Sequence, residues 1–212
     1  MFKNRDVLRA CQYSLIIAGL ATFISTIIGT AAALALEKHR FLLRSAVIRL
    51  LYLPLIIPDI VLAIALLMFY NSVNIPLGLT SVILAHVVFN VAYVTIVVRA
   101  RLQGYDYTVE EAALDLGANE WQTFWRITFP LIAPGIVGGA LLAFTLSIDD
   151  FVITFFTTGV GKTTLSVYIY SSIKFGLTPE LNAISSVLLV NSIVFVLLFV
   201  GFRGKTIQGI ND

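Results

Sequence analysis

The sequence contains few of the residues from which catalytic and metal sites are built. It has one cysteine, Cys11, and two histidines, His39 and His86, among 212 residues. A single cysteine excludes an internal disulfide and a site with several thiolate ligands. Two histidines far apart in the sequence give no indication of a zinc or catalytic centre. We therefore expect no catalytic residue and no metal ligand in this chain.

Charged residues are also scarce. They make up 12% of the chain, whereas a soluble domain has about 25%. Hydrophobic residues make up 58%, and the mean hydropathy is +0.94. The net charge of +2 is too small to indicate a nucleic-acid partner. This composition is typical of a protein that lies in membrane lipid.

Long apolar runs in the sequence predict five membrane-spanning segments. We expect these segments to be helices, because backbone polar groups in lipid must be paired within each segment. Their approximate bounds are 13–36, 45–70, 80–98, 131–150 and 182–202. Pro54 and Pro58 are expected to bend the second helix. Gly135, Gly138 and Gly139 are expected to allow close helix contact, or a hinge, in the fourth. The predicted fold is an all-α membrane protein, a five-helix bundle with an external hairpin or turn between the last two spans.

The first apolar run has a second interpretation, as a signal peptide with Lys3, Arg5 and Arg9 in its basic part. Its uncharged stretch runs from Ala10 to Leu36. That is longer than the roughly 7–15 apolar residues of a signal peptide, which favours a span. The expected organisation is an external N-terminal segment, a transmembrane domain and a cytoplasmic tail, at 1–9, 10–202 and 203–212.

Lysine and arginine are unequally distributed between the two sides of the predicted domain, and this sets its orientation. One side carries Lys38, Arg40, Arg44, Arg49, Arg99, Arg101, Arg126, Arg203 and Lys205. The other carries Lys3, Arg5, Arg9, Lys162 and Lys174. The first side is therefore predicted to be cytoplasmic, with the N-terminus outside and the C-terminus inside. A basic external N-terminus is unfavourable, so either the five-helix form is complete or an upstream helix is missing.

The polar segment between the third and fourth predicted spans contains ordered helix signals. Thr108 and Glu111 have the spacing of a capping box. The helix that they would begin has one apolar face, made of Val109, Ala112, Ala113 and Leu116. Gly117 can end it in the left-handed conformation. Asn119 can then cap a second helix.

The second helix would carry Trp121, Phe124 and Trp125 at helical spacing, and Pro130 would open the next span. One interpretation is a helix–turn–helix offered to a partner. The alternative is an amphipathic segment on the membrane, with its tryptophans among the lipid headgroups. In that case Glu111 would serve only as a helix cap.

The joint spacing favours the first interpretation. It reads Glu-Ala-Ala, three residues, Gly, nine residues, Ile-x-Phe-Pro, at Glu111, Ala112, Ala113, Gly117, Ile127, Phe129 and Pro130. It resembles the EAA loop of bacterial ABC importer permease subunits, in which a leucine stands where this chain has Phe129. The resemblance implies a type I importer permease fold in the bacterial plasma membrane, with a cytoplasmic coupling loop at 105–127. It also implies coupling residues, which are Glu111, Ala112, Ala113, Leu116, Gly117 and Trp121.

The same resemblance implies partners: an ATP-binding subunit, a second permease subunit and an external solute-binding protein. ATP and magnesium would lie on the ATP-binding subunit, and no cofactor would lie in this chain. Shorter stretches resemble the spermidine/putrescine branch of the family, in permeases of the C-subunit kind. They include Pro58-Asp59-Ile60-Val61, Ser147-Ile148-Asp149-Asp150-Phe151 and Phe175-Gly176-Leu177-Thr178-Pro179-Glu180. A polyamine cargo is therefore expected.

Carboxylates near or within spans are candidates for the path of a polyamine, because a buried acid in a membrane usually faces a wet cavity. The predicted path residues are Asp59, Asp149, Asp150, Tyr168 and Glu180, with the tyrosine offering a cation–π contact. Alternatively, Asp59 caps the helix after Pro58 and the other acids are wet external residues. His86 is interpreted as a helix-packing residue.

One motif is a decoy. Gly159-Val160-Gly161-Lys162-Thr163-Thr164 looks like half of a phosphate loop, but the first glycine of that motif would fall at Phe156. A tight external turn is expected there instead, so the chain would be no enzyme. Other functions stay open: an importer of another small solute such as iron(III) or an aminophosphonate, or an autonomous channel or secondary carrier.

Overall fold

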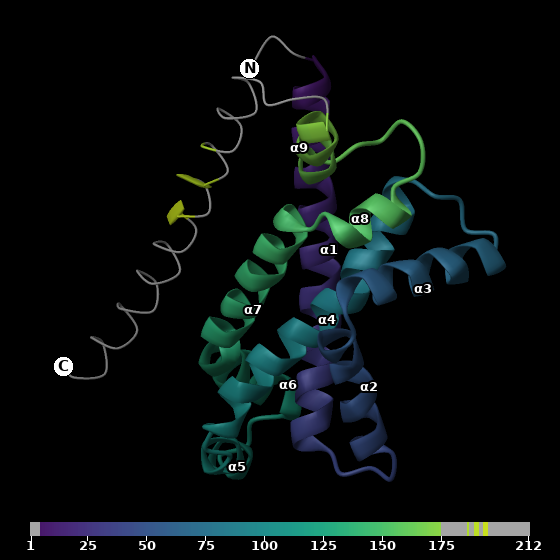
Figure 1. The fold of residues 1–212 in the computed structure, drawn as a ribbon. Helices are drawn as coiled ribbons and strands as arrows, with labels where there is room; N and C mark the ends of the chain where they lie inside the picture. The colour runs from purple at the N-terminus through teal and green to yellow at the C-terminus, as the bar shows by residue number, and fades with distance from the viewer. Residues whose placement is uncertain (1–4, 175–185, 187–188, 191–192, 195–212) are drawn as a thin grey trace.

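The computed structural model describes residues 5–174 together with 186, 189, 190, 193 and 194, and every element in that part is helical. Figure 1 shows long helices side by side, with short helices at both ends of the bundle. The elements are α1 (Arg5–Lys38), α2 (Arg44–Ile56), α3 (Asp59–Ser72), α4 (Leu79–Gln103), α5 (Thr108–Asp115), α6 (Glu120–Thr123), the π-helical turn η1 (Phe124–Thr128), α7 (Phe129–Asp149), α8 (Val152–Thr157) and α9 (Leu165–Lys174).

Helices α1, α4 and α7 form the core and pack pairwise against one another. Their approach is close because glycines face Val94 of α4 from both neighbours. A Cβ added at Gly29 would lie 2.8 Å from Val94 Cβ, and one at Gly139 would lie 3.3 Å from Val94 Cα. A Cβ at Gly135 would lie 2.8 Å from Arg101 Cβ. Close helix contact is thus confirmed at Gly135 and Gly139. Apolar side chains fill the space around them, namely Ala33, Val98, Leu102, Ile132 and Ala143.

The bend predicted in the second span is present, and it is sharp. The chain there forms α2 and α3, which meet at 111°. Ile57 is extended, with φ −72° and ψ 133°, because the ring of Pro58 crowds the residue before it. Pro58 also has no N–H to continue the helix. Pro54, by contrast, lies inside α2 without ending it.

Helix α3 lies across the bundle beside α8, as Figure 1 shows. Its inner face contributes Leu62, Leu66 and Tyr70 to an apolar cluster with Phe89 of α4 and Ile153 of α8. The extended residue between α2 and α3 does not by itself fix the angle between the two helices. The burial of the inner face of α3 therefore sets the direction of this helix.

The chain between α8 and α9 forms the expected turn. Gly159 and Gly161 have φ values of +68° and +85°, in the left-handed region that favours glycine. A Cβ at Gly159 would lie 2.8 Å from the carbonyl oxygen of Leu77, so this turn packs on the chain before α4. Helix α9 then packs on α1, where the N–H of Leu165 donates to Ser14 Oγ at 2.9 Å. The segment at 159–164, which looks like half of a phosphate loop, thus forms a tight turn.

Within the described residues, three helical runs are long and apolar enough to cross a membrane: α1, α4 and the continuous run Glu120–Asp149. The bent pair α2–α3 makes a fourth if it counts as one span. The described part of the chain is therefore an all-helical bundle with several spans. Almost all of the fifth predicted span, 182–202, lies outside the described residues, as do Glu180 and the tail at 203–212.

Candidate functional site

The segment predicted to dock a partner begins with α5, and its first turn differs from the prediction. Thr108 is the first helical residue, after Tyr107, and no capping box with Glu111 forms. Instead, Asp106 Oδ1 accepts from the backbone N–H of Thr108 at 3.0 Å and from its hydroxyl at 2.8 Å. The short side chain of Asp106 reaches the backbone two residues ahead and so takes over the role given to Thr108.

The turn after α5 has the predicted geometry. Gly117 has φ +88°. Its N–H donates to the carbonyl of Leu114 at 2.9 Å, and the N–H of Ala118 donates to that of Ala113 at 3.0 Å. This pair of bonds is a Schellman motif, which requires a left-handed residue after the helix. A Cβ at Gly117 would meet nothing within 4 Å, so the constraint is the backbone angle and not space.

Asn119 begins the second helix through a reciprocal capping box. Its Oδ1 accepts from the N–H of Gln122 at 2.8 Å, and its own N–H donates to Gln122 Oε1 at 3.2 Å. The cap at Asn119 is therefore confirmed. The partner was not predicted, although a glutamine three residues after a cap is a signal for it.

No break separates this second helix from the membrane span that follows. Helix α6 continues through η1 into α7, so that Glu120–Asp149 is one helical run. In η1 the N–H of Phe129 donates to the carbonyl of Phe124, five residues earlier. Pro130 follows in the first turn of α7. Single π-turns inside helices are often found at functional sites, and here one joins the docking segment rigidly to α7.

The predicted coupling residues lie on an accessible surface. Helix α5 buries none of its residues. Glu111 and Ala112 are exposed and Ala113 is half-buried. Leu116 and Trp121 are 89% and 70% exposed. This docking surface, defined by these residues, suits contact with another protein.

Glu110 is a residue of α5 whose role the sequence pattern did not indicate. Its two carboxylate oxygens accept from Lys38 Nζ at 2.8 and 2.7 Å, and Oε1 also accepts from Thr128 Oγ1 at 2.6 Å. Burial alone would raise the pKa of Glu110, but the bonds from Lys38 and Thr128 outweigh it and lower that pKa. The ionised carboxylate therefore links α5 to α1 and η1. Lys38 lies 72 positions away, so no local pattern reveals this contact.

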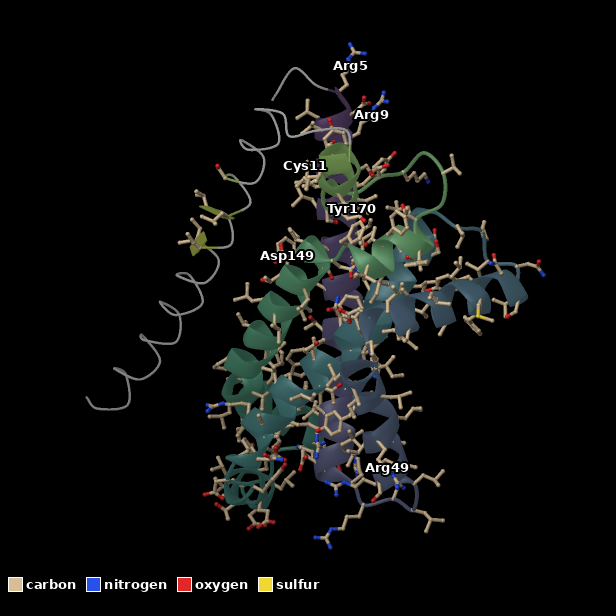
Figure 2. All side chains as sticks on the ribbon, viewed as in Figure 1. Arg5, Arg9, Cys11, Arg49, Asp149 and Tyr170 are labelled. Atoms are coloured by element: carbon tan, nitrogen blue, oxygen red, sulfur yellow. The ribbon has the colours of Figure 1, made fainter. Side chains whose placement is uncertain are left out.

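A second ionic group lies at the same end of the bundle. Arg99 of α4 pairs with Glu37 of α1 at 2.7 Å and donates to the hydroxyl of Tyr52 of α2 at 2.8 Å. Figure 2 shows Arg49 at this end and Arg5 at the opposite end. Arg49, from the basic group assigned to the cytoplasmic side, and Arg5, from the group assigned to the other side, are thus separated by the length of the bundle.

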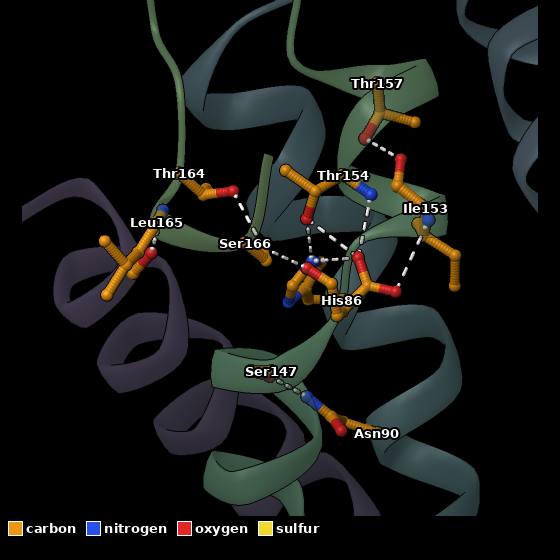
Figure 3. A network of polar contacts seen from close by, with 11 residues as sticks. His86, Asn90, Ser147, Ile153, Thr154, Thr157, Thr164, Leu165 and Ser166 are labelled. Atoms are coloured by element: carbon orange, nitrogen blue, oxygen red, sulfur yellow. Dashed lines mark hydrogen bonds and ion pairs between the residues drawn. The ribbon is translucent and has the colours of Figure 1, made fainter. Parts of the chain in front are cut away.

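A buried polar cluster joins α4 to the corner between α7 and α8 (Figure 3). His86 Nε2 lies 3.0 Å from Thr154 Oγ1 and 3.3 Å from Asp150 Oδ2. The N–H and hydroxyl of Thr154 both donate to Asp150 Oδ2 at 2.8 Å. Nearby, Asn90 Nδ2 donates to Ser147 Oγ at 2.7 Å. His86 is fully buried, in agreement with a packing role, and the carboxylate of Asp150 holds the first turn of α8.

The other predicted path residues lie on separate elements. Asp59 is exposed at the first position of α3, with no side-chain hydrogen bond that caps the helix. Asp149 is exposed at the last position of α7. Tyr168 packs beside the apolar contact between α1 and α9. Glu180 lies outside the described residues. Among the described members of this set, Asp59 and Asp149 are therefore the accessible carboxylates.

Comparison with known proteins gives one family. Residues 15–206 match the family described as "Binding-protein-dependent transport system inner membrane component". The spermidine/putrescine transport system permease protein PotC of Haemophilus influenzae is 41% identical over 198 residues, which are 93% of this chain and 77% of that protein. The putrescine transport system permease protein PotI of Escherichia coli is 38% identical, over 89% of this chain and 70% of its own length.

Solved structures share the fold. A chain of the MetNI methionine ABC transporter, in an inward-facing conformation, has a TM-score of 0.73 at 20% identity, over 93% of each chain. A chain of a bacterial alginate ABC transporter, in complex with a periplasmic protein bound to alginate pentasaccharide, also has a TM-score of 0.73, at 19% identity. It covers 93% of this chain and 78% of its own length. At this identity the likeness concerns the fold alone.

Proposed function

The chain belongs to the family of binding-protein-dependent transport system inner membrane components, and on this premise we propose that it is the permease subunit of an ATP-driven polyamine importer. The observation that carries the proposal is the 41% identity, over 93% of the chain, to a spermidine/putrescine permease protein. A putrescine permease protein is also similar. Spermidine and putrescine are the proposed cargo.

In this proposal an ATP-binding subunit docks on the surface formed by α5 and the start of α6. Glu111, Ala112, Ala113, Leu116, Gly117 and Trp121 are the proposed coupling residues. Their accessibility and the continuous run from α6 to α7 support this role. ATP and magnesium bind to the partner, so this chain provides the path and not the hydrolysis. Cargo moves against a gradient only if bound ATP favours one packing of the bundle over the other.

The proposed complex contains a second permease subunit, which completes the path, and an external solute-binding protein, which delivers the cargo. The docking surface and the C-terminus face the cytoplasm across the bacterial plasma membrane, and the N-terminus faces outward. The basic residues at the α5 end support this orientation, because lysine and arginine collect on the cytoplasmic side.

Asp59 and Asp149 are the proposed counter-charges for the cargo, because their carboxylates are accessible. The stacked rings of Phe151 and Tyr170, with centroids 4.3 Å apart, offer a cation–π surface close to Asp149 in the sequence. Asp150 has a different role in this scheme, since its carboxylate holds α8 against His86. Tyr168 and Glu180 remain proposed path residues.

The test is uptake of labelled spermidine and putrescine by the reconstituted complex. Asp59→Asn and Asp149→Asn are each expected to raise the KM for spermidine about tenfold, the equivalent of ~1.4 kcal/mol of lost charge attraction. Asp115→Asn, which removes an exposed carboxylate at the other end, is the matched control and should leave KM unchanged. Unchanged KM in both path variants would remove the counter-charge role.

The wild-type protein separates the alternatives. ATP-driven transport of neither polyamine would indicate another small solute, such as iron(III) or an aminophosphonate. Uptake without any ATP-binding subunit would indicate a channel or secondary carrier.

Glu111→Lys should abolish co-purification of the ATP-binding subunit, because it reverses a charge on the docking surface. Intact assembly and uptake in Glu111→Lys would contradict the docking role.

A further inference from the structure

Helix α5 is held in place mainly by polar contacts. It buries none of its residues, and its main packing neighbours are α6 and η1, which belong to the same segment. Hydrophobic burial therefore does little to fix α5 relative to the core helices. The ion pair from Glu110 to Lys38 and the hydrogen bond from Thr128 to Glu110 supply that connection.

This group, the Glu110 junction, consists of Lys38, Glu110 and Thr128. Lys38 is the last residue of α1, and Thr128 is the last residue of η1, directly before α7. Thr128 is fully buried, and the side chains of Glu110 and Lys38 are only 15% and 27% exposed. Charge-assisted hydrogen bonds in such partly dry surroundings are stronger than surface ion pairs. One carboxylate thus holds the ends of two core helices.

The path of the backbone makes this contact mechanically important. Through the chain, α5 connects forward to α7 through the Gly117 turn and α6, and backward to α4 through residues 104–107. The backbone route from α5 to α1 passes through α4, α3 and α2. The ion pair of Glu110 with Lys38 is thus a direct connection from the docking segment to α1. The two adjacent acids differ in their surroundings: Glu110 faces the bundle, whereas Glu111 faces solvent.

We propose that the Glu110 junction transmits movement of the docking segment to α1 and α7, with Glu110 acting as a positioning residue for coupling. The inference rests on the proposed function as a permease driven by an ATP-binding subunit. A force applied to the exposed face of α5 reaches α7 through the continuous helical run, and it reaches α1 directly through this connection, in addition to the indirect route over the α1–α7 contact. If the junction is weakened, the ATP-binding subunit still docks and hydrolyses ATP, but the core helices follow its movement less completely.

The experiment uses the complete complex in proteoliposomes and measures three quantities: assembly, the ATP hydrolysis rate, and cargo transported per ATP hydrolysed. Glu110→Gln is expected to keep the first two and to lower the third about tenfold, since a charge-assisted hydrogen bond is worth about one decade in an equilibrium. The reversed pair, Lys38→Glu with Glu110→Lys, should recover part of this loss. Lys38→Met removes the same ion pair from the side of α1 and should also lower the cargo transported per ATP. Its matched control is Arg40→Met, at an exposed cation just after α1, which should change nothing.

Two results would overturn the junction while leaving the proposed function intact. One is an unchanged ratio of cargo to ATP in Glu110→Gln. The other is a parallel loss of assembly, hydrolysis and uptake, which would make Glu110 a docking or folding residue. If Glu110→Gln does not accumulate, Thr128→Val is the second variant. It keeps the ion pair, removes one hydrogen bond to the ionised carboxylate and should lower the ratio severalfold. An unchanged ratio in Thr128→Val would also contradict the junction. Failure of the proposed function itself would appear in the wild-type complex.

Discussion

In the core, α1 and α7 approach α4 so closely that an added Cβ would crowd Val94, whereas α5 at one end of the same bundle buries no residue. The core helices come close because Gly29 and Gly139 have no side chain, and the apolar side chains packed around these glycines hold the helices together. The docking segment is held by an ion pair, two helix caps and one glycine turn.

This difference determines what each region tolerates. Dense apolar packing resists any change of volume. An exposed helix held by a few polar contacts resists a change of charge or of hydrogen bonding and tolerates many other changes. In the proposed complex, a partner can therefore move the predicted docking segment without first disrupting the core. Three experiments test whether the two regions respond in these different ways.

The largest effect is expected in the core, from Gly29→Leu. A Cβ there would already lie 2.8 Å from Val94 and 3.1 Å from the carbonyl of Val91, so a leucine must push α1 away from α4. Overpacking of this kind costs about 3 kcal/mol. Gly19→Leu is the control, because a Cβ at Gly19 in the same helix meets nothing within 4 Å. Thermal unfolding of the detergent-solubilised complex should separate the two, and equal melting temperatures would contradict close α1–α4 contact.

A smaller effect is expected from acid, at the Glu110 junction. The pKa of Glu110 is lower in the folded protein than its ordinary value of 4.5. The junction therefore stabilises the segment fully above that ordinary value, and its contribution is lost as the pH falls through the lowered pKa. The two tryptophans of the chain, Trp121 and Trp125, both lie on this segment, so their fluorescence reports its release.

The control for this titration is a matched set of variants. Glu110→Gln should remove the acid transition, whereas Glu111→Gln, at the exposed neighbour, should retain it. Hydrogen bonds from Thr108 also lower the pKa of Asp106, so Asp106→Asn must be titrated in parallel. A transition that persists in Glu110→Gln and disappears in Asp106→Asn would assign it to the start of α5 instead of the junction.

The two regions also differ in how far their structure could be predicted. The turn at Gly117 and the cap at Asn119 were predictable because each acts on backbone groups only a few residues away. The Glu110 junction was not, because its partners lie 72 and 18 positions away and neither has a distinctive neighbourhood. The spacing placed Glu110 outside the apolar stripe, and no pattern showed whether it faced water or the bundle.

The second predicted span shows the same limit. Pro54 and Pro58 carry the same local signal, and both were expected to bend one helix. Only Pro58 ends the helix, and α3 then turns by 111° to bury Leu62 against α8. That turn depends on contacts with a helix almost a hundred residues later in the chain. The existence of a break was therefore predictable from the prolines, whereas its angle follows from tertiary packing.

The smallest effect is expected at the turn between α5 and α6. Gly117 adopts φ +88°, so Gly117→Ala strains the backbone by about 1 kcal/mol without any steric clash. We expect a severalfold fall in affinity for the ATP-binding subunit, measured by titration of the purified partner, because the two helices no longer keep their angle. Gly104→Ala is the control, since Gly104 has φ −96° and also has open space around it. Equal affinities of the two variants would mean that docking depends on the side chains of α5 and not on the geometry of the turn.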